Sequence, residues 1–379
     1  MIRVLSVIGT RPEAIKMVPV IYEFARHSSH IISRICITGQ HREMLDSVLS
    51  LFDINPDHNL HLMKRSQSPI QVAAATLSRL EPILGKERPD WVIVQGDTTT
   101  AMTASVAAYY AGIKIAHVEA GLRTYDKMQP FPEEANRQIV GRVAELHFAP
   151  TQQARHNLLC ENISPDRIIV IGNTVIDALH TVAKLPYKLD SGPLKDVSWA
   201  KRIILVTVHR RENFGKPLES ICTALKDIAH YYGNDVDVIY PVHMNPNISK
   251  TVHRLLDGIP SITLISPLDY SSFVHLFKRS YLVLTDSGGL QEEAPSLGKP
   301  VLVLRNTTER PEAVSAGTSR LVGTDPSKIV GTFAELFEDP SVYQRMSRIL
   351  NLYGDGKSSK RIVKALLGER VDEFYASEI

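Results

Sequence analysis

Short runs of β-branched and other apolar residues recur along the chain, and each run is followed by a longer stretch of helical character. The runs are short and apolar on both faces, which is typical of buried parallel strands in βαβ units. They lie at 2–8, 31–37, 91–94, 113–118, 146–149 and 168–171, and then at 203–208, 236–240, 262–265, 281–285 and 301–304. Two such series predict an α/β protein with two doubly wound, Rossmann-like domains.

The length of 379 residues agrees with two domains, because single cores stop growing at roughly 250–300 residues. Residues 186–199 hold two prolines, a glycine and scattered charge, so we expect a surface connection near the domain boundary. From about Lys357 the pattern predicts an amphipathic helix, which by its pattern alone can pack on either domain.

The charge balance and the cysteine content bear on which partners and which cellular compartment we expect. The chain has 43 Lys and Arg against 41 Asp and Glu, which does not indicate a partner such as nucleic acid or a membrane surface. Its 3 cysteines are far apart and show no CxxC spacing, as expected of a reducing, cytoplasmic setting. No apolar run reaches the ~18 residues that span a bilayer.

Ligands of doubly wound folds bind beyond the carboxyl ends of the strands, so the residues directly after the predicted strands are the candidates for chemistry. Residues 9–16 (GTRPEAIK) follow the first strand and open a helix, with Pro12 suited to its first turn. A helix N-terminus attracts anions, and Arg11 and Lys16 add positive charge. We interpret the segment as a phosphate clamp; the alternative is two solvated helix cations.

Carboxylates at later strand ends are candidate acids or bases. Asp97 follows a strand but is equally suited to capping the next helix. Glu119 ends the next strand, and Arg123 lies close enough in sequence for a plain ion pair. Glu133 and Glu134 open a helix, where the helix dipole favours acids without any chemistry. That second interpretation weighs more for Glu134.

Further candidates follow strands in the second half. His209 is a candidate acid or base because imidazole titrates near neutrality, and His243 repeats the arrangement one strand later; a structural histidine is the alternative for both. Residues 287–289 (Ser-Gly-Gly) join a strand to a helix, where free backbone amides and the helix dipole favour a pyrophosphate over a simple tight turn. Glu293 is placed for ribose hydroxyls, and Arg310 supplies another cation.

Neither metal spacing (HExxH, paired CxxC or an interdomain DxD) nor a dinucleotide fingerprint is present in the sequence. We therefore expect a diphosphate site with several acids and bases, no metal and no cofactor.

These segments together resemble the non-hydrolysing UDP-N-acetylglucosamine 2-epimerases of bacteria across nearly the whole chain. The matching segments are GTRPEAIK (9–16), QHREMLD (40–46), GDTTT (96–100), HVEAGLRT (117–124), PFPEEANR (130–137), GNTVIDAL (172–179), HRREN (209–213), PVHMNP (241–246), TDSGGLQEEAPSLGKPVLVLR (285–305) and TTERPEA (307–313). So many motifs in the family's order make a chance match very improbable.

The resemblance implies a glycosyltransferase-B-like fold with two domains facing a cleft. Residues 1–172 would form the first domain, residues 173–356 the UDP-binding domain, and the helix within 357–379 would cross back onto the first. It also implies a homodimer without metal or redox cofactor. The implied activity is reversible inversion at carbon 2 of UDP-N-acetylglucosamine through elimination and re-addition of UDP, which supplies a precursor of cell-surface polysaccharide.

Residue roles carried over from the resemblance fall into acids and bases, diphosphate contacts, a uracil-facing aromatic and a ribose ligand. In that order they are Asp97, Glu119, Glu133 and His209; Arg11, Lys16, Ser287, Gly288, Gly289 and Arg310; Phe273; and Glu293. A second UDP-N-acetylglucosamine acting as allosteric activator is implied beside them. Its matching positions are Gln40, Glu43, Arg210 and His243.

Departures from the family pattern spare every assigned acid and base. They are Gln95, Ala116, Met128-Gln129, Asn306 and Leu352. The pair at 128–129 borders the expected cleft and bears on sugar preference, which keeps a UDP-2,3-diacetamido uronic acid open as substrate. A hydrolysing epimerase, a glycosyltransferase and a nucleotide-sugar sensor also remain open as functions. The intact 209–213 and 241–246 segments disfavour the first, and the retained acids and bases disfavour the last.

Overall fold

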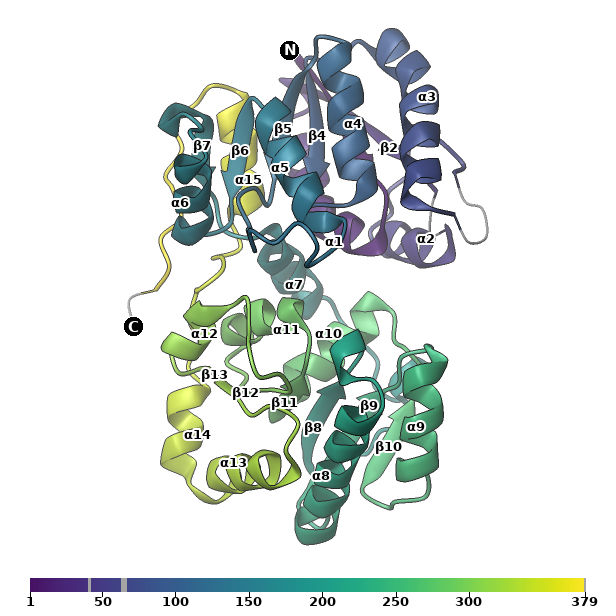
Figure 1. Cartoon of the computed structure of the whole chain (residues 1–379), viewed down its shortest axis with the longest axis vertical. Coiled ribbons are helices and arrows are strands. Elements are labelled where there is room, and N and C mark those ends of the chain that lie inside the picture. The colour runs from purple at the N-terminus through teal and green to yellow at the C-terminus, as the bar shows by residue number, and fades with distance from the viewer. Residues whose placement is uncertain (40–41, 63–66, 378–379) are drawn as a thin grey trace. The chain divides into compact units, whose positions relative to one another are not determined.

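The computed structural model describes residues 1–39, 42–62 and 67–377 (Figure 1). The chain divides into two compact units, one of Met1–His180 with Tyr353–Ala376 and the other of Thr181–Leu352 with Ser377. Each unit is built on its own parallel sheet. No helix in the described residues is long and apolar enough to cross a membrane.

The first unit contains a seven-stranded sheet in the order β3-β2-β1-β4-β5-β6-β7. Its strands are β1 (Ile2–Ile8), β2 (Ile31–Ile37), β3 (His58–Asn59), β4 (Trp91–Gln95), β5 (Lys114–Val118), β6 (Leu146–Ala149) and β7 (Ile168–Val170). The strand order reverses direction between β1 and β4. Loops that leave these two neighbours diverge to opposite sides, which opens the place where doubly wound sheets bind ligands.

Helices cover both faces of this sheet. They are α1 (Arg11–Arg26), α2 (Arg42–Leu51), α3 (Pro69–Glu87), α4 (Thr99–Tyr110), α5 (Glu133–Val143), α6 (Gln152–Cys160), α7 (Thr174–Lys184) and α15 (Ser358–Leu366). Helices α3, α4 and α5 lie side by side in sequence order on one face (Figure 1). Helix α1 packs between α2 and the C-terminal α15 on the other, as right-handed crossovers on the two sides of β1 require.

The second unit contains a six-stranded sheet in the order β10-β9-β8-β11-β12-β13, which reverses between β8 and β11. Its strands are β8 (Arg202–Thr207), β9 (Val236–Pro241), β10 (Ile262–Ile265), β11 (Leu282–Thr285), β12 (Val301–Val303) and β13 (Ser319–Leu321). Its helices are α8 (Lys216–Tyr232), α9 (Pro246–Leu256), α10 (Tyr270–Arg279), α11 (Gly288–Glu293), α12 (Pro311–Ser315), α13 (Pro326–Glu338) and α14 (Pro340–Met346).

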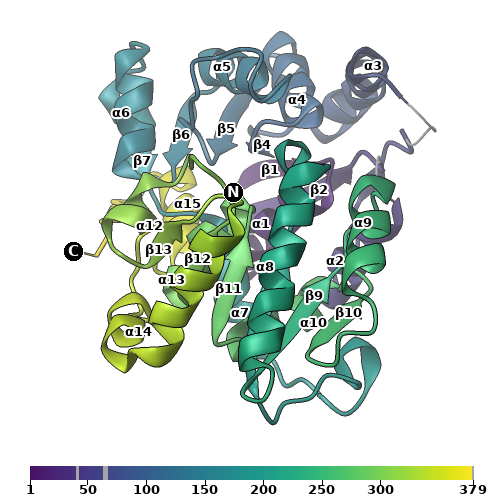
Figure 2. The same ribbon diagram turned by 60° about the horizontal axis from the view of Figure 1, so that its bottom comes forward.

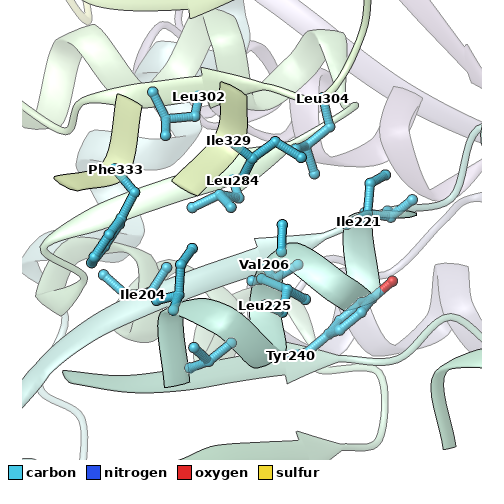
Figure 3. Close-up of a cluster of buried hydrophobic side chains, with 14 of the residues drawn as sticks. Ile204, Val206, Ile221, Leu225, Tyr240, Leu284, Leu302, Leu304, Ile329 and Phe333 are labelled. Atoms are coloured by element: carbon cyan, nitrogen blue, oxygen red, sulfur yellow. The ribbon is translucent and has the colours of Figure 1, made fainter. Parts of the chain in front are cut away.

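The core of the second unit forms where α8 and α13 pack beside each other on the sheet (Figure 2). Ile221 and Leu225 of α8 and Phe333 of α13 meet strand side chains such as Val206 and Leu284, and all of these are buried (Figure 3). Burying one such side chain stabilises the fold by roughly 1.5–3 kcal/mol. The central strands are therefore apolar on both faces, which is the pattern that predicts them from sequence.

The two doubly wound parallel sheets confirm the fold class expected from the sequence, and every predicted strand is present within one or two residues of its predicted bounds. Two strands had not been predicted, β3 and β13. Each is an edge strand of two or three residues. A strand of two or three residues is too short to show a pattern of apolar positions. It forms only because it pairs with the adjacent strand of the sheet.

The first unit ends at His180, inside α7, rather than at residue 172. The N-terminal half of α7 is tied to the C-terminal segment, because Asp177 accepts hydrogen bonds from the amides of Ser358 and Ser359 at 3.2 and 2.9 Å and so caps α15. The segment 186–199 belongs to the second unit and buries Leu194, so it is more than a surface connection.

Candidate functional site

Glu119 stands directly after β5 in a left-handed backbone conformation, with φ of 65°. A non-glycine residue there is uncommon, and such strain clusters at functional positions. Its Oε2 accepts from Lys16 Nζ at 2.5 Å and from Gln95 Nε2 at 2.8 Å. The side chain is 10% exposed. The structure thus brings Lys16 of α1, Gln95 of β4 and Glu119 together at the β1/β4 switch point.

The alternative of a plain ion pair between Glu119 and Arg123 is wrong. Arg123 instead binds Glu161 of α6 through two parallel bonds of 2.6 and 2.9 Å. Its guanidinium is fully buried, so a bidentate carboxylate partner is what keeps its charge compensated. This pair fixes the segment after Glu119 and leaves the Glu119 carboxylate to Lys16 and Gln95.

Asp97 does not cap α4, and that alternative is also wrong. Thr98 is the N-cap and accepts from the amide of Ala101 at 3.0 Å. The Asp97 carboxylate instead receives Arg137 Nε at 2.9 Å and Nη2 at 2.6 Å. Asn136 donates to the Asp97 carbonyl at 2.8 Å. Helix α5 thereby orients a carboxylate that β4 delivers.

The two acids at the start of α5 have different environments. Glu134 is buried and accepts from the amides of Thr124 and Tyr125 at 3.0 and 3.2 Å, so it anchors the loop that follows β5. Burial raises the pKa of Glu134, but these bonds, a bond from Gln138 and the charge of Arg137 together lower it below its ordinary value. Glu133, one residue earlier, is partly exposed. The structure gives Glu134 a structural role and places Glu133 on the same helix as the partner of Asp97.

Glu13 is a site-adjacent residue that sequence reasoning missed. It lies in the first turn of α1, only 1% exposed, and accepts from Thr98 Oγ1 at 2.9 Å. Burial raises the pKa of Glu13 to about 7, against hydrogen bonds from Thr10 and Thr98 that lower it, and nearby Asp97 adds to the rise. An acid in a first helical turn is ordinary in sequence, so no signal marked its burial.

Arg11 is the first residue of α1, with Pro12 in the first turn as expected. The turn before it packs tightly: a Cβ added at Gly9 would lie 2.4 Å from Thr100 Oγ1 of α4. Only glycine permits this approach of the β1–α1 turn to the start of α4. Arg11 and Lys16 therefore lie on one helix next to the two loops that carry Asp97 and Glu119.

In the second unit, His209 follows β8 and Asp286 follows the neighbouring β11. Asp286 is fully buried, and its Oδ1 lies 3.3 Å from His209 Nδ1. Asp286 also accepts from the amides of His209 and Arg210 at 3.0 and 2.9 Å and from Asn213 Nδ2 at 2.9 Å. Burial lowers the pKa of His209, Asp286 raises it, and Arg210 and His243 lower it. Sequence reasoning did not single out Asp286.

The Ser287–Gly289 turn begins α11 at the β8/β11 switch point. A Cβ added at Gly288 would lie 3.5 Å from Arg210 Nη2 and 3.8 Å from Arg310 Cζ, so two guanidinium groups flank this glycine. The structure brings together Ser287–Gly289, Arg210 and Arg310. Backbone amides at a helix start beside two arginines form a strongly anion-attracting surface.

Ion pairs with acidic residues hold the neighbours of this turn. Arg310 is paired with Glu292, and Glu293 is buried on the same helix α11. Arg305 binds Glu309 through two bonds of 2.6 and 3.3 Å. Although burial raises it, this contact lowers the pKa of Glu309 to about 2. The segment that carries Arg310 is therefore fixed on both sides.

The remaining predicted residues are placed as follows. Phe273 is partly buried on α10, one helical turn from Phe277, with ring centroids 6.1 Å apart. His243 is exposed after β9, and its ring centroid lies 6.2 Å from that of His209. Gln40 and the side chain of Glu43 lie outside the described residues. Among the described residues, no group of three or more His, Cys, Asp or Glu is arranged to hold a metal ion.

Residues 24–367 match the family model described as UDP-N-acetylglucosamine 2-epimerase. The chain belongs to this family. It is 51% identical to the UDP-N-acetylglucosamine 2-epimerase of Salmonella typhimurium over 375 residues, which cover 97% of this chain and 99% of the relative.

Solved structures of family members have the same fold. The Neisseria meningitidis UDP-GlcNAc 2-epimerase bound to UDP-GlcNAc is 47% identical, with a TM-score of 0.88 over 97% of this chain and 100% of the other. The Methanocaldococcus jannaschii enzyme in complex with UDP-GlcNAc and UDP is 33% identical, with a TM-score of 0.80 over 97% and 99%. The family resemblance drawn from the motifs is thereby confirmed.

Proposed function

We propose that this chain interconverts UDP-N-acetylglucosamine and UDP-N-acetylmannosamine by inverting carbon 2, without net hydrolysis. The observation that carries the proposal is Glu119, a carboxylate on a strained turn at the switch point, oriented by Lys16 and Gln95. Asp97 in its Arg137 clamp and Glu133 on α5 add two further acids in the same unit. Family membership gives the substrate class.

The proposed chemistry is an elimination followed by an addition. A base takes the proton from carbon 2 while the bond between carbon 1 and the UDP oxygen breaks, which leaves 2-acetamidoglucal and UDP. A second acid then protonates carbon 2 from the other face, and UDP adds back to carbon 1. Two faces need at least two proton-transfer groups, for which Asp97, Glu119, Glu133 and His209 are the candidates.

The leaving UDP must be stabilised and retained between the two halves of the reaction. We assign its diphosphate to the Ser287–Gly289 turn and Arg310, with Glu293 for the ribose and Phe273 for the uracil. Arg11 and Lys16 supply positive charge from α1. Because Lys16 contacts Glu119 in the structure, we propose that it serves both the carboxylate and the departing phosphate.

Proton NMR of the purified protein with UDP-N-acetylglucosamine in heavy water tests this function. The expected product is UDP-N-acetylmannosamine that carries deuterium at carbon 2, since the proton passes through an exchangeable acid. Release of free N-acetylmannosamine and UDP would instead establish a hydrolysing epimerase. An unchanged spectrum would refute the proposal for this sugar, and the 2,3-diacetamido uronic acid nucleotide would be the next substrate.

Three further assignments belong to the same proposal. Arg210 and His243, which lie beside His209, are proposed to receive a second UDP-N-acetylglucosamine as activator, and a sigmoidal dependence of initial rate on substrate would support this. The homodimer implied by the resemblance is checked by light scattering. The cytoplasm is the proposed location, since the three cysteines, Cys36, Cys160 and Cys222, are unpaired.

A further inference from the structure

We propose that Asp286 is a positioning residue that orients the His209 imidazole and fixes its tautomer, so that His209 presents Nε2 to the reaction. The inference rests on the proposed role of His209 as an acid or base. Asp286 itself need not touch the substrate, because it acts from behind the histidine.

The first argument is position. Strands β8 and β11 are neighbours in register, with Thr207 opposite Thr285. Asp286 is therefore the first residue after its strand at the place where the adjacent chain turns into His209. Its side chain is fully buried, whereas that of His209 is 42% exposed. The Asp286 carboxylate thus lies in the protein interior, whereas part of the His209 side chain is exposed to solvent.

The second argument is the distribution of hydrogen bonds around the carboxylate. Oδ2 receives the amides of His209 and Arg210 and the side-chain amide of Asn213. Oδ1 also accepts from the amide of His209 at 3.2 Å and lies 3.3 Å from His209 Nδ1. Three donors lock the carboxylate in place, so the oxygen directed at the ring has a fixed direction.

The third argument is chemical. A carboxylate can only accept, so the Nδ1 next to it is the nitrogen that carries the proton. The lone pair of a neutral ring then lies on Nε2, the ring nitrogen that Asp286 does not contact. A carboxylate that holds a histidine in this way sets both tautomer and orientation, as it does in hydrolytic triads. The groups that act electrostatically on His209 are Asp286, Arg210 and His243.

The substitution Asp286→Asn tests the coupling. We expect kcat to fall by about tenfold or more, because loss of a carboxylate that orients a functional histidine lowers turnover, while the Kd for UDP changes little. The His209 titration, followed by NMR with ¹³C-labelled histidine, should move to lower pH because a negative charge is lost. Asp237→Asn is the matched control, since Asp237 is a buried acid of the same sheet, paired with Lys201 at 3.5 Å.

A double-substitution cycle separates this inference from the proposed function. If Asp286 acts through His209, Asp286→Asn costs less than about twofold in kcat when His209 is already Asn. An equal cost in both backgrounds, or a fall in UDP affinity that accounts for the whole loss, overturns the inference. Normal turnover of His209→Asn alone would instead refute the acid–base role of His209, and the NMR coupling would stand or fall independently.

One measurement needs no substitution at Asp286 and so survives a variant that does not fold. The ¹⁵N shifts of the His209 ring in the unsubstituted protein report its tautomer directly, with the resonance assigned from the His209→Asn spectrum. We expect the proton on Nδ1. A neutral ring with its proton on Nε2 overturns the inference.

Discussion

The buried carboxyl of Glu13 gives a stability prediction whose size follows from the structure. Burial raises its pKa from 4.5 to about 7, and the side chain is 1% exposed. The difference between these pKa values corresponds to about 3 kcal/mol, an upper value for the cost of ionising Glu13 in the folded protein. The substitution Glu13→Gln removes that cost, while the amide oxygen can still accept from Thr98.

The direction of the pH dependence follows from proton binding. Below pH 4.5 Glu13 is protonated in both folded and unfolded chains, and it costs nothing. Between pH 4.5 and 7 the folded chain binds more protons than the unfolded chain, so stability falls as pH rises. Above about pH 7 the full cost is present. The free energy of unfolding of Glu13→Gln, relative to the unsubstituted protein, should therefore increase by up to about 3 kcal/mol from about pH 5 to about pH 8.

Urea unfolding at several pH values measures this difference. The chain has 2 tryptophans, and Trp91 lies on β4 of the first unit, so a Trp199→Phe background makes the fluorescence report on the unit that contains Glu13. Glu134→Gln is the control: Glu134 is also buried, but its pKa is lowered, so its effect should be constant over the same pH range. If the Glu13→Gln difference were equally constant, the reasoning would be refuted.

The remaining predictions concern close packing, orientation and capping. Gly121→Ala should lower the free energy of unfolding in urea by about 3 kcal/mol or more, because the new Cβ would lie 2.2 Å from a backbone carbonyl of α6. The control Gly112→Ala, also at positive φ but in open space, should lower it by about 1 kcal/mol. Equal losses would contradict the argument. Gln95→Leu should lower kcat by about tenfold with UDP affinity kept, since Glu119 loses an orienting hydrogen bond to its charged group. Unchanged turnover would count against that role. Asp177→Ala should speed proteolysis of the 353–376 segment, because α15 loses the oxygens that accept from its first amides. An unaltered cleavage rate would show that the cap is dispensable.

The sequence predicted the central strands well because their signal is local. Strands such as β1 and β8 are buried on both faces, so a run of apolar residues identifies each without knowledge of its neighbours. The edge strands β3 and β13 have no such run, and their existence depends on a partner that only the fold supplies. The helix cap at Thr98 rather than Asp97 was ambiguous for a related reason. Both residue types cap helices. The Asp97 carboxylate instead forms an ion pair with Arg137, which is distant in sequence.

The strand-end rule selects candidate residues, but it cannot tell which acids hold the loops and which remain for chemistry. Ion pairs between residues distant in sequence decided this. Lys16 was interpreted as a phosphate contact, but it forms an ion pair with Glu119. Arg123 was the expected partner of Glu119, but it forms its ion pair with Glu161. Burial of Glu13 and Asp286 had no signal in sequence, since acids after strands and in first helical turns are ordinary.

Three buried carboxylates of this chain have the same structural role. Glu134 receives two amides of the loop after β5, Asp286 receives two amides of the loop after β8, and Asp177 receives two amides at the start of α15. Amides in loops have no neighbouring strand to bond, and leaving them buried without partners costs free energy. A carboxylate bonded to consecutive amides satisfies them and stiffens the loop through charge-assisted bonds. Loops that carry acids and bases after β5 and β8 are thereby held from behind, so that a mobile element of the fold gains the fixed geometry that proton transfer at a single carbon requires.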